Sequence, residues 1–402
     1  MKRIIIAFLC GVAAAADIVP GSYIVQLKAG TVATSHHRAV RSILRKRDST
    51  VQSFTIGDDF NAYVATSLTD EDAATLAARE DVLTVEPDVW YYHDDLNSTS
   101  ESIEPRALTT QSPAGTWSLG DVSHRAAGAR DYVYDDSAGS GQTVYVIDSG
   151  VRISHQEFEG RARFGFSGVS GSTRYEEDDE GHGTHVAGTV AGKTFGLAKK
   201  AEVVAVKAFQ GGGGQASWIL NSINWAVNDI IARNAKATSV LNLSLGGAAS
   251  SSSAMENAVR AAWNQGIVSV SAAGNSDQPA SGTSPGRIAE TITVGMTGPS
   301  RRRVQVIAGA FGSNYGPELD VFAPGQDIVS ASWQSDTGSR STTGTSMATP
   351  LVSGLICYLR RLEGGLTTPA SVKARLLQLA HTGVVTDPKG SPNVLVYNGS
   401  GQ

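Results

Sequence analysis

Cysteine is almost missing from this sequence of 402 residues, which contains only Cys10 and Cys357. Because Cys10 lies in an N-terminal segment that we expect to be removed, the mature protein would keep one thiol and no internal disulfide. Cys357 falls in an apolar run, so we expect an inert, buried helix residue. No apolar run after the N-terminus is long enough to span a bilayer. A formal net charge of −5 gives no electrostatic reason to expect nucleic-acid binding.

Three short motifs carry residues suited to chemistry. The run from Val144 to Gly150 is apolar and β-branched and ends in Asp148 and a glycine turn, which is typical of a buried parallel strand. His182 stands among glycines at the start of a small-residue helix. Ser346 opens an apolar helix, where free N–H groups and the helix dipole favour a nearby oxyanion.

These three side chains together fit nucleophilic catalysis. A serine hydroxyl is a weak nucleophile until an imidazole takes its proton, and that imidazole needs a carboxylate to fix its tautomer and stabilise its cation. We therefore predict Ser346 as nucleophile, His182 as general base and Asp148 as the orienting carboxylate. Taken alone, the serine motif favours an ordinary helix N-cap, so the prediction depends on the other two motifs.

The order Asp, His, Ser along the chain is that of the subtilisin arrangement. On these motifs the sequence resembles the subtilisin-like serine proteases, and within that family the fungal proteinase K type. A fourth motif, Ala272–Asn275, also matches. The resemblance implies that the Asn275 amide and the Ser346 N–H stabilise the oxyanion. It also implies an α/β fold with a parallel sheet covered by helices on both faces, which the alternation of strand and helix patterns from Glu202 to Ser271 favours independently.

The N-terminal part reads as three successive segments. Residues 1–16 have a basic start, a short apolar core and small residues at the end, which predicts a secretory signal peptide. Residues 17–106 follow the order β-α-β-β-α-β of a small α+β ferredoxin-like domain and end in a polar linker. By resemblance this is an inhibitory propeptide, and the peptidase domain is residues 107–402. The family cuts itself near Ala107, although Arg106 could instead be cut by a trypsin-like partner.

Two glycine-bearing segments correspond in the family to the backbone strands between which an extended peptide pairs. Glycines let the peptide backbone approach closely, and main-chain hydrogen bonds disregard most of the substrate sequence. The residues that this resemblance assigns to substrate binding are Gly212, Gly213, Gly214, Ser244, Leu245 and Gly246.

The resemblance implies no cofactor for the chemistry, but it implies a structural calcium ion. Its ligands would be the carbonyls of Ala289 and Thr291 and the carboxylate of Asp320, all hard oxygens that suit Ca²⁺. The alternative is that Asp320 is an ordinary surface carboxylate, because the segment from Met296 to Ser313 is longer than in the proteinase K type.

The acidic run Glu176–Glu180 allows two interpretations. The first, which we favour, is a solvated loop; the second is an electrostatic feature that attracts basic substrate residues and raises the pKa of His182. Among the N-glycosylation sequons, Asn398 is the predicted glycan site.

The sequence thus predicts a secreted, extracellular serine endopeptidase of broad specificity, made as a self-processed zymogen. We expect protein or peptide substrates, the propeptide as inhibitor, no nucleic-acid or membrane partner, and a monomer. Two alternatives stay open: a catalytically silent secreted protein that binds peptides, and a hydrolase that prefers esters. The natural substrate cannot be derived from the sequence.

Overall fold

The structure is a computed structural model. It describes residues 17–45, 51–92, 96–98, 110–172, 174, 176–249, 253–305 and 311–402. The predicted signal peptide and the predicted start of the mature chain near Ala107 lie outside these ranges.

The N-terminal residues form a small α+β unit, which we call the N-terminal unit (residues 17–92). Its elements are β1 (Ile18–Leu27), α1 (Ala33–Ala39), α2 (Arg41–Arg45), β2 (Val51–Ile56), β3 (Phe60–Ala65), α3 (Asp70–Ala77) and β4 (Val82–Tyr92). The strands pair antiparallel in the order β4-β1-β3-β2. The Thr69 side chain caps α3 by accepting from the N–H of Asp72, as an N-cap threonine should. The predicted ferredoxin-like order is confirmed.

A nine-stranded sheet forms the centre of the larger unit. Its order is β20 (His381–Thr382), β21 (Val394–Leu395), β17 (Val321–Pro324), β16 (Ile292–Thr297), β14 (Val268–Ala272), β12 (Ser239–Leu243), β8 (Thr143–Asp148), β10 (Glu202–Lys207) and β9 (Ala162–Ser167). All neighbours pair in parallel except β20 and β21, which are antiparallel. The predicted α/β fold with a parallel sheet is therefore correct.

Helices cover both faces of this sheet because its strands are apolar on both sides. Along β8, Val144 and Val146 belong to one apolar cluster and Tyr145 and Ile147 to the other. The first cluster includes side chains of α4 (Trp117–Ser123), α5 (His182–Ala191), α8 (Thr345–Glu363) and α9 (Pro369–Leu379); the second includes α6 (Ala216–Ala232) and α7 (Ser253–Asn264).

Short elements complete the larger unit. They are β5 (Leu96–Ser98), β6 (Thr110–Gln111), β7 (Tyr132–Val133), η1 (Gln156–Phe158), β11 (Gly213–Gln215), η2 (Lys236–Thr238), β13 (Gly247–Ala248), η4 (Ala280–Gly282), β15 (Thr283–Ser284), β18 (Ile328–Ala331) and β19 (Ser339–Thr343).

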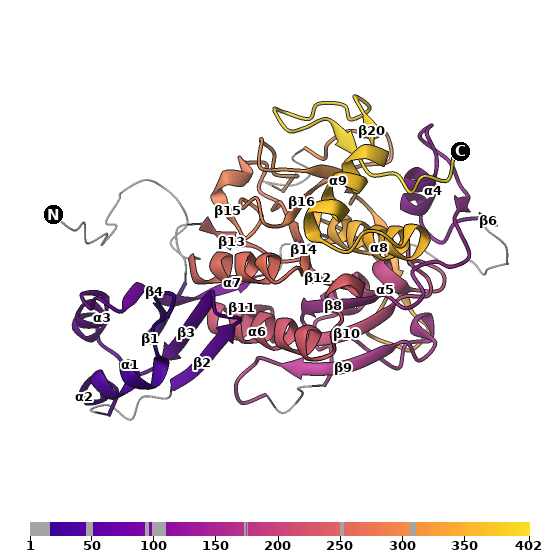
Figure 1. The fold of residues 1–402 in the computed structure, drawn as a ribbon. Coiled ribbons are helices and arrows are strands. Elements are labelled where there is room, and N and C mark those ends of the chain that lie inside the picture. Colours follow the sequence, from indigo (N-terminus) through magenta and orange to yellow (C-terminus); the bar gives the residue numbers. More distant parts are fainter. Residues whose placement is uncertain are drawn as a thin grey trace.

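The N-terminal unit lies against α6 and α7, as the indigo elements in Figure 1 show. Apolar side chains of β1, β2, β3 and β4 join those of α6 and α7 in one cluster. The N-terminal unit therefore covers the outer side of the two helices that cover the sheet.

The burial of Cys357 confirms the prediction made for this thiol. Cys357 is fully buried in α8, and burial raises the pKa of its thiol to about 12, so it is inert as predicted. Within the described ranges, no helix combines the length and the apolar character that crossing a bilayer requires.

Candidate active site

The first two predicted catalytic residues are in direct contact. Asp148 ends β8 and His182 begins α5, and both side chains are buried. Nδ1 of His182 lies 2.7 Å from Oδ1 of Asp148, which also accepts from the N–H of Ser149 at 2.7 Å. Because a carboxylate can only accept, Nδ1 carries the proton and Nε2 is the basic nitrogen of the ring.

Gly183 allows this contact. A side-chain carbon at Gly183 would lie 2.0 Å from the carbonyl oxygen of Gly150 and 3.1 Å from Cβ of Asp148. Only a glycine lets α5 begin so close to the end of β8.

The second histidine of the motif has a structural role. His185 is fully buried, and its Nε2 lies 2.8 Å from the carbonyl oxygen of Ile328. Burial, and to a smaller extent the charge of Arg340, lowers its pKa to about 3, so this ring stays neutral. The geometry thus distinguishes His182, which contacts a carboxylate, from His185, which contacts backbone.

Ser346 is the second residue of α8 and is only 7% exposed. Its Oγ donates to the carbonyl oxygen of Ser244 at 3.3 Å, and Oγ of Ser244 donates to the carbonyl oxygen of Ser346 at 2.9 Å. The predicted nucleophile therefore lies beside the second predicted substrate-binding segment.

Asn275 is fixed against the residue that precedes Ser346. Its Oδ1 accepts from the backbone N–H and from Oγ1 of Thr345, both at 2.8 Å. With this oxygen occupied by Thr345, the rest of the side chain is an amide NH₂ group, which can only donate. A donor group next to the first turn of α8 agrees with the role predicted for Asn275.

The first predicted substrate-binding segment is paired with the N-terminal unit. Strand β11 pairs antiparallel with the end of β4, with Gly213 opposite Tyr92 and Gly214 opposite Tyr91. Tyr91 is buried, and a side-chain carbon on Gly247 would lie 2.1 Å from its ring. Since Gly247 directly follows the second segment, the chain of the N-terminal unit lies along one segment and its tyrosine contacts the end of the other.

The prediction that the acidic run Glu176–Glu180 is a solvated loop is correct only for its first two residues. Glu176 and Glu177 are exposed, whereas Asp178 is buried. Asp178 accepts from Oγ of Ser149 at 2.9 Å and from the N–H groups of Gly181 and Thr184 at 2.7 and 2.9 Å. This carboxylate therefore satisfies donors around the first turn of α5, where an anion is favoured.

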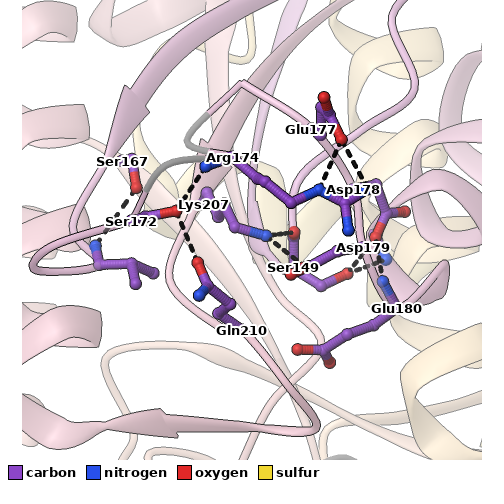
Figure 2. Close-up of polar contacts among 12 residues, drawn as sticks. Ser149, Ser167, Ser172, Arg174, Glu177, Asp178, Asp179, Glu180, Lys207 and Gln210 are labelled. Carbon is purple, nitrogen blue, oxygen red and sulfur yellow. Dashed lines mark hydrogen bonds and ion pairs between the residues drawn. The ribbon is translucent and has the colours of Figure 1, made fainter.

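The next two acidic residues of the run also have specific partners. Nζ of Lys207 is buried between Oδ1 of Asp179, at 2.6 Å, and the carbonyl oxygen of Ser149, at 2.5 Å, as Figure 2 shows. Oε1 of Glu180 accepts from the N–H of Gly212 at 2.9 Å.

Glu180 thus links the loop before His182 to the first substrate-binding segment. Burial raises its pKa to about 7, with smaller contributions from the charges of Asp148 and Asp179, while the Gly212 hydrogen bond and Lys207 oppose the shift. From the sequence, Glu180 could be identified only as part of an acidic run. Its specific role was missed because Gly212, its hydrogen-bond partner, lies 32 residues further along the chain.

The oxygens of the predicted calcium site do come together, but a lysine binds them. Nζ of Lys373 lies 2.8 Å from Oδ1 of Asp320, 3.2 Å from the carbonyl oxygen of Ala289 and 3.1 Å from that of Thr291. With this ammonium in place the residues do not fit a calcium ion. Among the described residues, no group of three His, Cys, Asp or Glu side chains is arranged to hold a metal ion.

The predicted glycan site is wrong on structural grounds. Asn398 is 1% exposed, its Nδ2 donates to the carbonyl oxygen of Val133 at 2.8 Å, and its Oδ1 accepts from the N–H of Ser400. A glycan on Nδ2 would have to break this buried contact.

Comparisons with known proteins agree with the geometry. The model of the Subtilase family matches residues 139–401, and that of Peptidase inhibitor I9 matches residues 22–94. Alkaline protease 1 of Aspergillus clavatus is 44% identical over 398 residues, covering 96% of this chain and 92% of the relative. Subtilisin-like protease 2 of Pseudogymnoascus destructans is 48% identical over 301 residues, covering 74% of this chain and 71% of the relative.

A solved structure is also similar. It is described as the crystal structure of a cold adapted subtilisin-like serine proteinase, with 38% sequence identity and a TM-score of 0.63 over 70% of this chain and 97% of that one. The chain therefore belongs to the subtilase family: it is a serine-type endopeptidase preceded by an I9 inhibitor domain, its propeptide.

Proposed function

We propose that the chain is a secreted, self-processing zymogen in which Asp148, His182 and Ser346 form the catalytic triad and hydrolyse proteins with broad specificity. One observation carries this proposal: the pairing of β4 with β11, by which the propeptide lies along the predicted substrate-binding segment. A segment that inhibits a peptidase by occupying its cleft is expected to bind as a substrate does, as an added strand.

Broad specificity follows from this mode of binding. The β4–β11 contact is made between backbones, and Gly213 and Gly214 contribute no side chains to it. Backbone hydrogen bonds do not discriminate among substrate sequences, so selectivity is left to a few side-chain contacts. The buried ring of Tyr91 supports a preference for bulky apolar groups at the equivalent substrate position.

The chemistry that we assign to the triad combines the Asp148–His182 contact with the general mechanism of serine nucleophiles. Nε2 of His182 takes the proton of Ser346 as Oγ attacks the scissile carbonyl, and later gives it to the leaving amine. Asp148 holds the Nδ1–H tautomer through its 2.7 Å contact and stabilises the imidazolium that forms.

The charge that develops on the carbonyl oxygen needs donors. We assign the amide NH₂ of Asn275 and the N–H of Ser346, which belongs to the first turn of α8 and lacks an intrahelical acceptor. In related systems one such donor lowers the barrier by about 3 kcal/mol.

Pairing on a second strand supports self-processing. Strand β5, downstream of β4, pairs antiparallel with β19, which ends three residues before Ser346. Strand β4 thus pairs with β11 and strand β5 pairs with β19. The link between β4 and β5 therefore connects two strands that are both held by the peptidase. We expect the first cut between Tyr92 and Leu96, and a second step that trims the mature chain to a start near Ala107.

Secretion is supported by the sequence of residues 1–16, which has the features of a signal peptide. The domain limits that follow are residues 1–16 for the signal, 17–106 for the propeptide with its linker, and 107–402 for the peptidase. The partners expected are protein substrates and the propeptide, with the mature enzyme acting as a monomer.

The test is expression of the full chain beside Ser346→Ala and Ser353→Ala. Ser353 lies in the same helix and is also buried, and its Oγ donates to Asn242, which reaches Ser346 only through Ser244. We expect the parent and Ser353→Ala to be secreted and processed, with a first new N-terminus between residues 93 and 96, while Ser346→Ala keeps its propeptide.

Each alternative has its own outcome. If Ser346→Ala is processed like the parent, another protease does the cutting. A processed parent that hydrolyses peptide esters but not casein would support the ester-preferring hydrolase. A parent inert toward both substrates would support the silent peptide-binding protein and overturn the proposal.

A further inference from the structure

The three oxygens that family resemblance implies as calcium ligands come from two neighbouring strands. Ala289 and Thr291 precede β16, and Asp320 directly precedes β17, which pairs with β16 in parallel. Strand starts that lie side by side bring the two carbonyls and the carboxylate to one place. The local fold therefore builds the oxygen cluster that a cation would need.

An ammonium group occupies the centre of this cluster. Lys373 projects from α9, and its Nζ lies 2.8, 3.1 and 3.2 Å from Asp320, Thr291 and Ala289 respectively. An ammonium has three N–H donors and no acceptor, so three oxygens use its full capacity. The contacts are hydrogen bonds in length, longer than the 2.3–2.6 Å that calcium makes to oxygen.

The cluster does not depend on the lysine for its shape. Oδ2 of Asp320 accepts from the N–H of Thr293 at 3.0 Å, so the carboxylate is also held through its second oxygen, while Lys373 contacts Oδ1 at 2.8 Å. The Asp320 and Lys373 side chains are only 18% and 20% exposed. Removal of the ammonium would therefore leave a formed, partly buried, negatively charged site without its cation.

We propose that Lys373 is a built-in cation that replaces calcium at this position, so that this peptidase needs no calcium ion there. The lysine connects α9 to the segments directly before β16 and β17. A bound ion would otherwise have to neutralise the oxygens at this place. A cation that belongs to the chain cannot be removed by a chelator or lost by dilution.

The main test uses Lys373→Ala in the full-length Ser346→Ala chain, which prevents self-digestion. In this variant we expect a lower Tm in a chelator and recovery of the loss in millimolar calcium, because the emptied site can now bind the ion. The parent chain should show no such difference arising from this site.

Trp263 gives a direct and local readout. Nζ of Lys373 lies 5.9 Å from the ring centroid of Trp263, so a terbium ion bound in its place would be excited through this tryptophan. We expect terbium luminescence in Lys373→Ala that is lost on adding Trp263→Phe, and no Trp263-dependent luminescence in the parent. A Trp263-dependent signal in the parent would show that the metal displaces the lysine and would overturn the proposal.

Two further variants separate the cation site from general effects of charge. Lys200→Ala removes an ammonium that pairs with Asp136 at 3.0 Å on the surface, and it should show no response to calcium. Lys373→Met keeps the apolar stem but no charge, and should lower the Tm without recovery in calcium. If Lys373→Ala binds neither calcium nor terbium, the oxygen cluster is not a cation site and the proposal fails.

Discussion

The two faces of the propeptide sheet are both apolar, but they are covered by different partners. One face packs against the propeptide's own helices through side chains that include Val25, Leu27, Tyr63, Ala65, Val40, Leu44 and Leu76. The other packs against α6 and α7 of the peptidase through Ile24, Phe54, Ile56, Phe60, Ala62, Val64 and Val89. Along β1 and β3 the alternate residues serve the two faces in turn.

The difference shows which face stabilises the propeptide and which one binds the enzyme. The enzyme-facing side also has carboxylates at its border: Glu86 accepts from the N–H of Ala254 at 2.9 Å, and Asp88 from that of Ser217 at 3.0 Å. These residues lie at the N-terminal ends of α7 and α6, where free N–H groups favour an acceptor. The enzyme-facing contact thus combines an apolar centre with titratable groups.

The largest expected effect concerns the apolar centre. Phe54 is fully buried against the peptidase helices, and Phe54→Ala should weaken inhibition by the released propeptide by about 3–5 kcal/mol, which is at least about 100-fold in Ki. The thermal stability of the isolated propeptide should change little. The matched variant Leu76→Ala, on the other face, should instead lower that stability; equal behaviour of the two variants would remove the distinction between the faces.

A smaller effect concerns pH. Burial raises the pKa of Glu86 and of Asp88 in the complex, although the hydrogen bonds from α7 and α6 oppose the shift. The complex therefore binds more protons than the separated partners, so inhibition should be tightest in acid and weaken as pH rises through the raised pKa values. Ki measured across this range should show that slope, and Glu86→Gln with Asp88→Asn should flatten it; an unchanged slope would exclude these carboxylates as its source.

The smallest expected effect concerns the edge of the sheet, where β4 pairs with β11. Glu180→Gln keeps an acceptor for the N–H of Gly212 but removes the charge, so KM for an extended peptide should rise by a few-fold above pH 7, on the order of 1 kcal/mol or less. Below pH 7, where the parent carboxyl is protonated, the two enzymes should converge.

Two comparisons decide whether this effect comes from the edge contact. Substrates too short to reach β11 should show no difference between the enzymes. Glu177 is an exposed residue of the same loop and pairs with Arg174. Glu177→Gln removes the same charge, and its KM should equal that of the parent at every pH. A KM shift of equal size in both variants would mean that general charge, and not the Gly212 contact, is responsible.

Much of the fold and of the site can be predicted from the sequence, because local pattern encodes them. Asp148 ends an apolar strand, His182 begins a small-residue helix and Ser346 begins an apolar helix, so their places follow from local sequence, while their assignment as a triad rests also on the family resemblance. The end of β4 is different, because the local pattern Val82–Glu86 indicates a strand that stops at Glu86. In the structure β4 continues through Pro87 to Val89 by pairing with β1, and on to Tyr92 because β11 supplies a partner more than 100 residues later in the chain.

The remaining misses have the same origin. Nothing in the local sequence marks Lys373 as different from other helix lysines, because the carbonyls that it binds belong to a segment some 80 residues earlier. Asn398 has a valid sequon, but its amide is buried and donates to the carbonyl oxygen of Val133. The roles of Lys373 and Asn398 are both determined by contacts between residues far apart in the chain, which the local sequence does not reveal.

The covalent link between β4 and the peptidase has a consequence for timing. While the link is intact, the inhibitory strand is held beside β11 at an effective concentration on the order of millimolar, which external substrates cannot match. Once the link is cut, occupancy depends on the concentration of free propeptide, which falls on dilution. The same strand therefore inhibits the enzyme strongly while it is covalently attached and weakly once it is cut and diluted.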